Sequence, residues 1–344
     1  MQGSYIRVGD ADKPMTEYEI YSYEAFRKKY RDDIRAIEDV SFRSLDTAKV
    51  DAYLALKHCE RPNLAVLPDE QQYELTGVMR NGKITITALL LFGLYPQAFY
   101  PQLSIIATSV PGKEMGALDS NGNRFLDSKR IEGTLPDMLD GAIAFVRTNM
   151  RTATKIDPKT GERMDVTQYP ITAVREAVLN ALVHRDYSFH TEGMPIQLVM
   201  YSDRMEITNP GGLYGRLTVD QLGQAQPDTR NPVLVTAMET LGKTENRYSG
   251  IPTIRYARNI PFRHRCLWIR AERSRSFCLT RLKNKLCHRQ SIDVKQPFRM
   301  KKDSLNSAVH RAVDRRLSTI LPLHPSNMLS DVIWIRWCMP GRFA

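Results

Sequence analysis

The chain has 344 residues, 42% of them hydrophobic and 25% charged, which is the composition of a globular protein with room for two or three domains. No apolar run reaches the roughly 18 residues that a membrane helix needs. The first residues also lack the basic and apolar regions of a secretion signal. We therefore expect a cytoplasmic protein that does not enter a membrane.

The net charge of +11 is unevenly distributed along the chain. Residues 256–344 hold 19 basic and 5 acidic side chains, whereas the first 255 residues hold 30 and 33. The body of the protein is therefore close to neutral. The C-terminal tail is basic, and one interpretation is an arm that binds phosphate groups electrostatically.

The N-terminal segment predicts a short strand over residues 5–9 and then a helix. Thr16 and Glu19 have the spacing of a capping box, in which each side chain bonds to the backbone nitrogen of the other residue. Asp46 has the position of a cap for a second helix. Local sequence thus predicts where both helices begin.

Residues 41–155 predict a mixed region of helices and strands. The pair Asn81-Gly82 is typical of a tight hairpin turn, and the apolar run 86–94 has the length of a buried core element. Residues 101–110 alternate well enough to form a strand. Residues 135–150 predict an amphipathic helix. Nothing in this region has the spacing of a catalytic site.

The polar residues 155–163 predict an exposed link into a further domain. There, residues 196–208 alternate as a pair of strands joined by a turn. Asn231 is expected to cap a helix that has Pro232 at its first position and Gly242 just beyond its end. The first backbone amides of this helix are candidates to hold an anion.

One face of the helix predicted around residues 175–187 carries polar side chains. Glu176, Asn180 and His184 follow one another at intervals of four residues, so they project from the same face. A carboxylate can orient or deprotonate a water, and an amide oxygen can bind a hard cation. A solvated polar stripe is the alternative for these residues considered alone.

The second motif follows the predicted strand pair. Asn209 precedes a proline and two glycines, Gly211 and Gly212. An asparagine oxygen can accept a hydrogen bond from an adenine amino group, as an uncharged and weaker partner than aspartate. Such a sequence also forms ordinary turns at strand ends, and this alternative stays open.

Together the two motifs read R-E-A-V-L-N-A-L-V-H-R-D-Y over residues 175–187 and D-R-M-E-I-T-N-P-G-G-L over residues 203–213. They resemble the nucleotide-binding motifs of the GHKL (Bergerat-fold) ATPases. The fuller wording is similar to a subfamily of bacterial regulators often labelled RecG-like helicases or transcriptional regulators. Members of that subfamily usually carry a Schlafen/AlbA-type DNA-binding domain in front.

The resemblance implies an α/β (α+β) fold, with a two-layer Bergerat-type sandwich preceded by a mixed α/β domain. It implies ATP and Mg²⁺ as ligands. Glu176 would be the general base for water attack, and Asn180 would be the Mg²⁺ ligand. Asn209 would recognise adenine.

The remaining predicted contacts to the nucleotide are also inferences from the resemblance or from position. They come from His184, which would lie near the site, and from Gly211 and Gly212, which would seat the adenosine. Arg230, just before the capped helix, is a candidate phosphate contact. Ser249 and Gly250 stand where many relatives have a glycine-rich lid, and they supply only half of it.

Two other enzyme classes are excluded. His184-Arg185-Asp186 spells the catalytic triplet of protein kinases, but these need an asparagine where this chain has Thr191, and no glycine-rich kinase loop precedes it. We expect Arg185 and Asp186 to form a local ion pair instead. The chain has no Walker A motif, so a helicase label would rest on names alone.

The resemblance also suggests how the chain is divided. Residues 1–40 are similar to the last strand and closing helix of the Schlafen/AlbA-type domain, so the chain looks truncated at its start. A middle domain is expected over 41–155 and the ATP-binding domain over 160–257. In residues 258–344 the family pattern stops abruptly, which suggests a frame-shift product of uncertain or no regular structure.

The predicted function is an ATP-binding module of a bacterial DNA-linked regulator, with hydrolysis as a further expectation. DNA is the expected partner of the full-length relatives, mainly through the missing N-terminal domain, and subunits are expected to associate. The alternatives are a non-catalytic regulator that binds DNA or another partner, and an inactive gene fragment.

Overall fold

The computed structural model describes residues 4–8, 11–156, 160–212, 214–215, 228–244, 266–270, 277–278 and 332–338. All of them belong to one of the two compact units of the chain. The helices and strands are β1 (Tyr5–Val8), β2 (Ala11–Pro14), α1 (Glu17–Lys28), α2 (Thr47–Glu60), α3 (Asp69–Thr76), β3 (Met79–Arg80), β4 (Lys83–Ile84), α4 (Ile86–Phe92), β5 (Ile105–Ser109), β6 (Asp127–Ile131), α5 (Leu135–Asn149), β7 (Thr152–Ile156), β8 (Arg163–Thr167), α6 (Ile171–Val183), β9 (Ile196–Met200), β10 (Arg204–Pro210), α7 (Pro232–Thr240), β11 (Cys266–Arg270), β12 (Phe277–Cys278) and β13 (Val332–Cys338).

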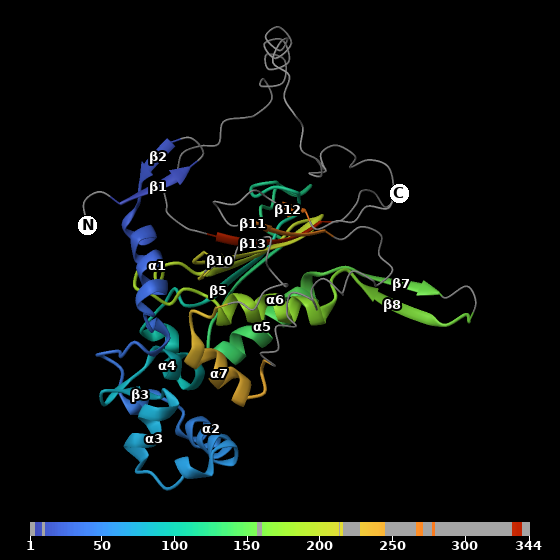
Figure 1. The fold of residues 1–344 in the computed structure, drawn as a ribbon. Coiled ribbons are helices and arrows are strands. Elements are labelled where there is room, and N and C mark those ends of the chain that lie inside the picture. Colours follow the sequence, from blue (N-terminus) through green and yellow to red (C-terminus); the bar gives the residue numbers. More distant parts are fainter. Residues whose placement is uncertain are drawn as a thin grey trace, which may run out of the picture. The chain divides into compact units, whose positions relative to one another are not determined.

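A seven-stranded sheet organises the described residues, with the strand order β12-β11-β13-β10-β9-β5-β6. The pair β5–β9 is parallel, and the other neighbours are antiparallel. The helices α5 and α6 pack against each other and against this sheet (Figure 1). This arrangement confirms the predicted mixture of helices and strands in an α+β fold.

The hydrophobic core lies between these helices and the sheet. α5 contributes Leu139, Ile143, Phe145 and Val146, all buried as their spacing in the sequence predicts. The apolar run 86–94 forms α4, whose seven residues are all buried. One continuous core contains side chains from every helix between α2 and α7 except α3, together with β5, β9 and β10.

The sheet crosses the domain boundary expected between residues 155 and 160. Strands β5 and β6 come from the region expected to form a separate middle domain, and β5 pairs both with β6 and with β9 from the expected ATP-binding domain. The residues expected to link these domains lie in and between β7 and β8, which form an exposed hairpin.

Local signals predicted the helix starts correctly. Thr16 and Glu19 form both bonds of the capping box at α1, and the Asp46 side chain accepts a hydrogen bond from the backbone nitrogen of Lys49 at α2. Asn81 and Gly82 have positive φ angles of 52° and 71°, as a tight turn between β3 and β4 requires.

The tail differs from the expectation of a segment without regular structure. β11 and β13 extend the sheet beyond β10, and β12 pairs with β11. The sequence of β13, VIWIRWC, is rich in β-branched and aromatic residues, which favour strands. None of the described helices is long and apolar enough to cross a bilayer.

Candidate functional site

The polar face of α6 carries the predicted pair of side chains. α6 is otherwise apolar, and its buried residues pack inward, which leaves Glu176 and Asn180 half-exposed. The Asn180 Nδ2 atom donates to the Glu176 Oε1 atom over 3.2 Å. The amide nitrogen therefore faces the carboxylate, and the amide oxygen points elsewhere. This is the orientation that a cation ligand needs.

His184 stands at the C-terminal end of the same helix. Its backbone nitrogen donates to the Asn180 carbonyl oxygen over 3.0 Å, and its backbone has already left the helical conformation. The residue keeps solvent-accessible surface, but its imidazole is surrounded closely enough that burial lowers its pKa to about 4. The structure therefore places all three predicted side chains along one edge of α6, as their spacing indicates.

Three chain segments meet at this end of α6. The Asp186 backbone nitrogen donates to the carbonyl oxygen of Pro210, the last residue of β10, over 3.2 Å. The Asn231 Nδ2 atom donates to the carbonyl oxygens of Val183 (2.8 Å) and Arg185 (2.7 Å). The end of α6, the end of β10 and the start of α7 are thus joined by buried hydrogen bonds.

Asn231 is at the N-cap position of α7, as predicted, but its side chain does not cap the helix. The side chain is used to hold the end of α6 instead. The free amides expected at the start of α7 are also occupied, since the Val233 nitrogen donates to the Asp33 carboxylate over 2.7 Å. This helix end therefore already binds an anion, supplied by the protein itself.

The predicted adenine segment spans the end of β10 and the two glycines after it, and we call residues 209–212 the glycine turn. Asn209 is 5% exposed, and its Oδ1 atom has no hydrogen-bond partner among the described residues. Gly211 has a φ angle of +99°, and a Cβ atom there would lie 2.6 Å from Asp186 Cβ and 2.8 Å from Arg230 Nη1. Only glycine fits this position. Gly212 is half-buried.

The glycine turn packs on a buried network that the sequence did not predict. Arg230 forms an ion pair with Asp186, and the hydroxyl of Tyr18 on α1 donates to the same carboxylate over 2.8 Å. Burial alone would raise the pKa of Asp186, but Arg230 and these hydrogen bonds outweigh it and hold that pKa below its ordinary value of 3.8.

Arg230, the candidate phosphate contact, is 6% exposed and forms an ion pair with Asp186, so its charge already has a partner within the protein. The expected ion pair between Arg185 and its neighbour Asp186 is wrong, because Asp186 pairs with Arg230 instead. The Nη2 atom of Arg185 donates to the carbonyl oxygens of Thr191 and Met194.

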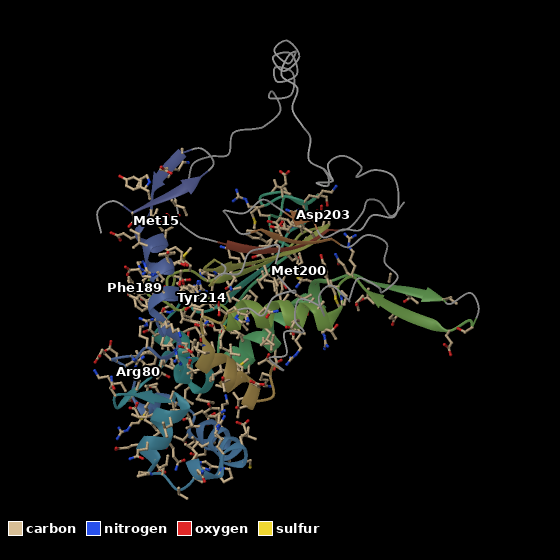
Figure 2. All side chains as sticks on the ribbon, in the orientation of Figure 1. Met15, Arg80, Phe189, Met200, Asp203 and Tyr214 are labelled. Carbon is tan, nitrogen blue, oxygen red and sulfur yellow. The ribbon has the colours of Figure 1, made fainter. Side chains whose placement is uncertain are left out.

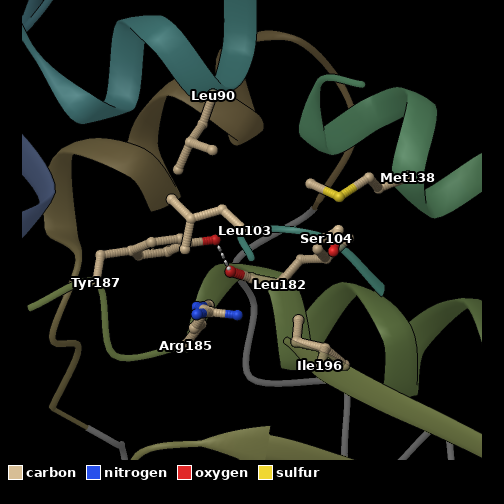
Figure 3. A pocket seen from close by; sticks show the side chains of 8 residues that line it. All are labelled: Leu90, Leu103, Ser104, Met138, Leu182, Arg185, Tyr187 and Ile196. Atoms are coloured by element: carbon tan, nitrogen blue, oxygen red, sulfur yellow. Dashed lines mark hydrogen bonds between the residues drawn. The ribbon is translucent and has the colours of Figure 1, made fainter. Parts of the chain in front are cut away.

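Arg185 also lines a small cavity between α4, α5 and α6 (Figure 3). The space is about 10 Å³, room for roughly one water molecule. The Nε and Nη1 atoms of Arg185 have no partner among the described residues, and burial lowers the pKa of this side chain to about 10. Arg185 therefore stays charged at neutral pH, and the cavity is too small for a nucleotide.

The predicted lid residues, Ser249 and Gly250, lie outside the described residues. The described residues contain no group of three or more His, Cys, Asp or Glu side chains that could hold a metal ion by themselves. A cation at Asn180 would therefore take further ligands from phosphate oxygens and water, which is the usual manner of Mg²⁺. The side chains present fit that mode of binding.

Comparisons with known proteins agree with the ATPase resemblance at a coarse level. Residues 193–280 match the family model described as "Putative ATP-dependent DNA helicase recG C-terminal". The match supports an ATPase-type, RecG-related module. It includes Asn209, the glycines and Arg230, whereas Glu176 and Asn180 precede its first residue.

Among solved structures, the chain is similar to the DIP2311 protein from Corynebacterium diphtheriae, with 22% sequence identity and a TM-score of 0.47. The similarity covers 74% of this chain and 48% of that protein, so the chain spans about half of its length. No curated protein matches the chain.

Proposed function

We propose that this chain binds ATP together with Mg²⁺, at the edge formed by α6 and the glycine turn. The observation that carries the proposal is the hydrogen bond from the Asn180 amide to the Glu176 carboxylate on a half-exposed helix face. This bond orients the amide oxygen away from the carboxylate. Asn180 would bind Mg²⁺, which bridges the phosphate oxygens.

Adenine would be recognised by Asn209 and the glycines that follow it. The Oδ1 atom of Asn209 is an acceptor without a partner among the described residues, and an adenine amino group is a donor. Buried acceptors without partners are costly, so a ligand that donates there gains affinity. Gly211 would let the turn pack closely on Asp186 and Arg230, and the half-buried Gly212 would leave its backbone accessible to the adenosine.

The structure supports binding more directly than turnover. Glu176 would act as a general base by polarising a water towards the terminal phosphate, and its carboxylate already accepts from Asn180. This bond holds the carboxylate in place, but it also uses one of its acceptor sites. We propose ATP hydrolysis as a second step that depends on Glu176.

Calorimetric titration of MgATP into the full chain tests the proposal. We expect saturable heat that disappears with EDTA, and Asn180→Ala should weaken MgATP binding roughly 10-fold or more. Asn63→Ala is the matched control, because Asn63 is an exposed asparagine away from α6. A folded chain that gives no heat would refute nucleotide binding, and equal affinities of both variants would refute the site.

Hydrolysis is tested separately with Glu176→Gln. This variant keeps the shape of the side chain and its hydrogen bond to Asn180, but it lacks the basic carboxylate. We expect MgATP to bind and phosphate release to fall to the background rate. Phosphate release equal to that of the unaltered chain would show that Glu176 is not the base.

The charge of the tail favours a second candidate function, binding of DNA. Residues 256–344 carry 19 basic and 5 acidic side chains, and phosphate contacts make DNA affinity fall steeply with salt. We propose that the module serves a DNA-linked regulator and forms homo-oligomers. DNA affinity that keeps its salt dependence when Lys283, Lys285 and Arg289 are replaced by glutamine would show that the charge of the tail is not responsible.

A further inference from the structure

We infer that α1 is a positioning element of the nucleotide site. Tyr18 acts through Asp186 to hold the glycine turn in its nucleotide-binding conformation, so docking of α1 and binding of nucleotide stabilise each other. This inference rests on the proposed function. It assigns a role to an N-terminal helix that lies far from the nucleotide motifs in the sequence.

The first contact of α1 lies on one side of the glycine turn. Tyr18 is 8% exposed, and its hydroxyl donates to Asp186 Oδ2. Asp186 in turn is the residue nearest to the position that a Cβ atom would take at Gly211, and its backbone nitrogen donates to the carbonyl oxygen of Pro210. A shift of Tyr18 is therefore transmitted to the turn through Asp186, which accepts from Tyr18 at Oδ2 and donates to Pro210 from its backbone nitrogen.

The second contact of α1 is made with the chain that follows the turn. Tyr214, three residues after Gly211, packs its ring edge-on against Phe26 of α1, with 5.6 Å between the ring centres. The Tyr214 hydroxyl donates to the Ala25 carbonyl oxygen over 3.4 Å. Tyr214 is labelled among the described side chains in Figure 2. α1 thus contacts Asp186, whose backbone bonds to Pro210 in the turn, and Tyr214, which follows the turn.

Tyr21 makes the further contacts of α1, with the loop after α6 and with Asp32. The ring of Tyr21 lies against His190 and Phe189, at centre distances of 4.6 Å and 5.7 Å. The Tyr21 hydroxyl donates to Asp32 over 2.6 Å. The opposite face of α1 is solvated, as shown by Tyr23, which is 61% exposed. A helix attached by one face can undock without unfolding the core.

Thermodynamic linkage predicts how nucleotide binding and the docking of α1 affect each other. If docked α1 favours the binding-competent turn, nucleotide must favour docked α1 by the same factor. Weaker docking of α1 lowers the fraction of molecules whose turn is competent to bind nucleotide. The apparent dissociation constant of the nucleotide is the intrinsic constant divided by that fraction, so it rises. A purely structural role of Tyr18 would change stability but would not make α1 respond to nucleotide.

The test compares Tyr18→Phe with Tyr23→Phe, the same substitution on the solvated face of the same helix. Calorimetry with MgATP gives affinity, and amide hydrogen exchange gives the protection of residues 17–28 with and without MgATP. We expect MgATP to slow exchange of α1 in the unaltered chain and in Tyr23→Phe. In Tyr18→Phe we expect this protection to be reduced and MgATP binding to be roughly 3- to 10-fold weaker.

The results of these measurements distinguish failure of the coupling from failure of nucleotide binding. MgATP binding with unchanged exchange of α1, or equal affinities of the two variants, would overturn the coupling and leave the proposed function intact. Absence of MgATP binding by the unaltered chain would remove both. A second substitution, Tyr214→Phe, tests the other end of the turn and should weaken binding less than Tyr18→Phe, since its longer hydrogen bond goes to an uncharged carbonyl.

Discussion

Replacement of Gly211 by alanine should be unusually destabilising for a change of one methyl group. At a φ angle of +99°, a residue with a side chain costs about 1–2 kcal/mol through its backbone alone. The new Cβ would also lie 2.6 Å from Asp186 Cβ, where carbon atoms normally keep about 3.5–4.0 Å apart. Relief of this contact moves Asp186, a member of a buried ion pair, and overpacking of this kind costs about 1–3 kcal/mol. We expect a total loss of about 2–5 kcal/mol in the free energy of unfolding.

The control is Gly122→Ala, because Gly122 has a φ angle of +81° and nothing within 4 Å of its Cβ position. This control variant should lose only the backbone contribution to the free energy of unfolding, about 1–2 kcal/mol. Urea unfolding followed by circular dichroism measures both variants against the unaltered chain, with equal m-values as the condition for comparison. Equal losses would refute the close packing of the glycine turn on Asp186 and Arg230.

Two further substitutions probe the same junction. Asp186→Asn should cost about 3–5 kcal/mol at pH 7, because Arg230 keeps its buried charge without a partner. The folded-state pKa of Asp186 is lowered, so its contribution is present above about pH 4, near the unfolded-state pKa, and is lost as the pH falls through the folded-state value. The stability gap between variant and parent should therefore narrow between pH 7 and pH 3 in urea unfolding, and a constant gap would contradict the ion pair. Asn231→Ala removes two buried hydrogen bonds to the end of α6; we expect a loss of about 2–4 kcal/mol, and a melting temperature within a degree of the parent's would contradict that role.

The features that the sequence predicted correctly depend on near neighbours. The capping box of Thr16 and Glu19 and the turn at Asn81 are decided by residues within three positions. The polar face of Glu176 and Asn180 needs only the helical repeat of 3.6 residues. These features follow from local physics, so no knowledge of the tertiary fold was necessary.

The errors concern choices between partners that lie far apart in the chain. Asp186 had an adjacent arginine and a distant one, and the tertiary fold pairs it with Arg230, 44 residues away. Asn231 has a side chain suited to a helix cap, but its Nδ2 atom donates to two carbonyl oxygens at the end of α6, and its Oδ1 atom has no partner among the described residues. Side-chain chemistry is visible in the sequence, whereas the identity of the competing partner is not.

The position of Asp186 also decides how the proposed nucleotide would be held. Because this carboxylate neutralises Arg230, the described part of the glycine turn offers no unpaired arginine to the phosphates. Glu176 adds a second carboxylate nearby on α6. A triphosphate would meet repulsion here unless a cation intervened, and Asn180 is the side chain oriented to hold one. Affinity for ATP should therefore depend on Mg²⁺ far more than on salt, since Debye screening acts weakly on partly buried charges.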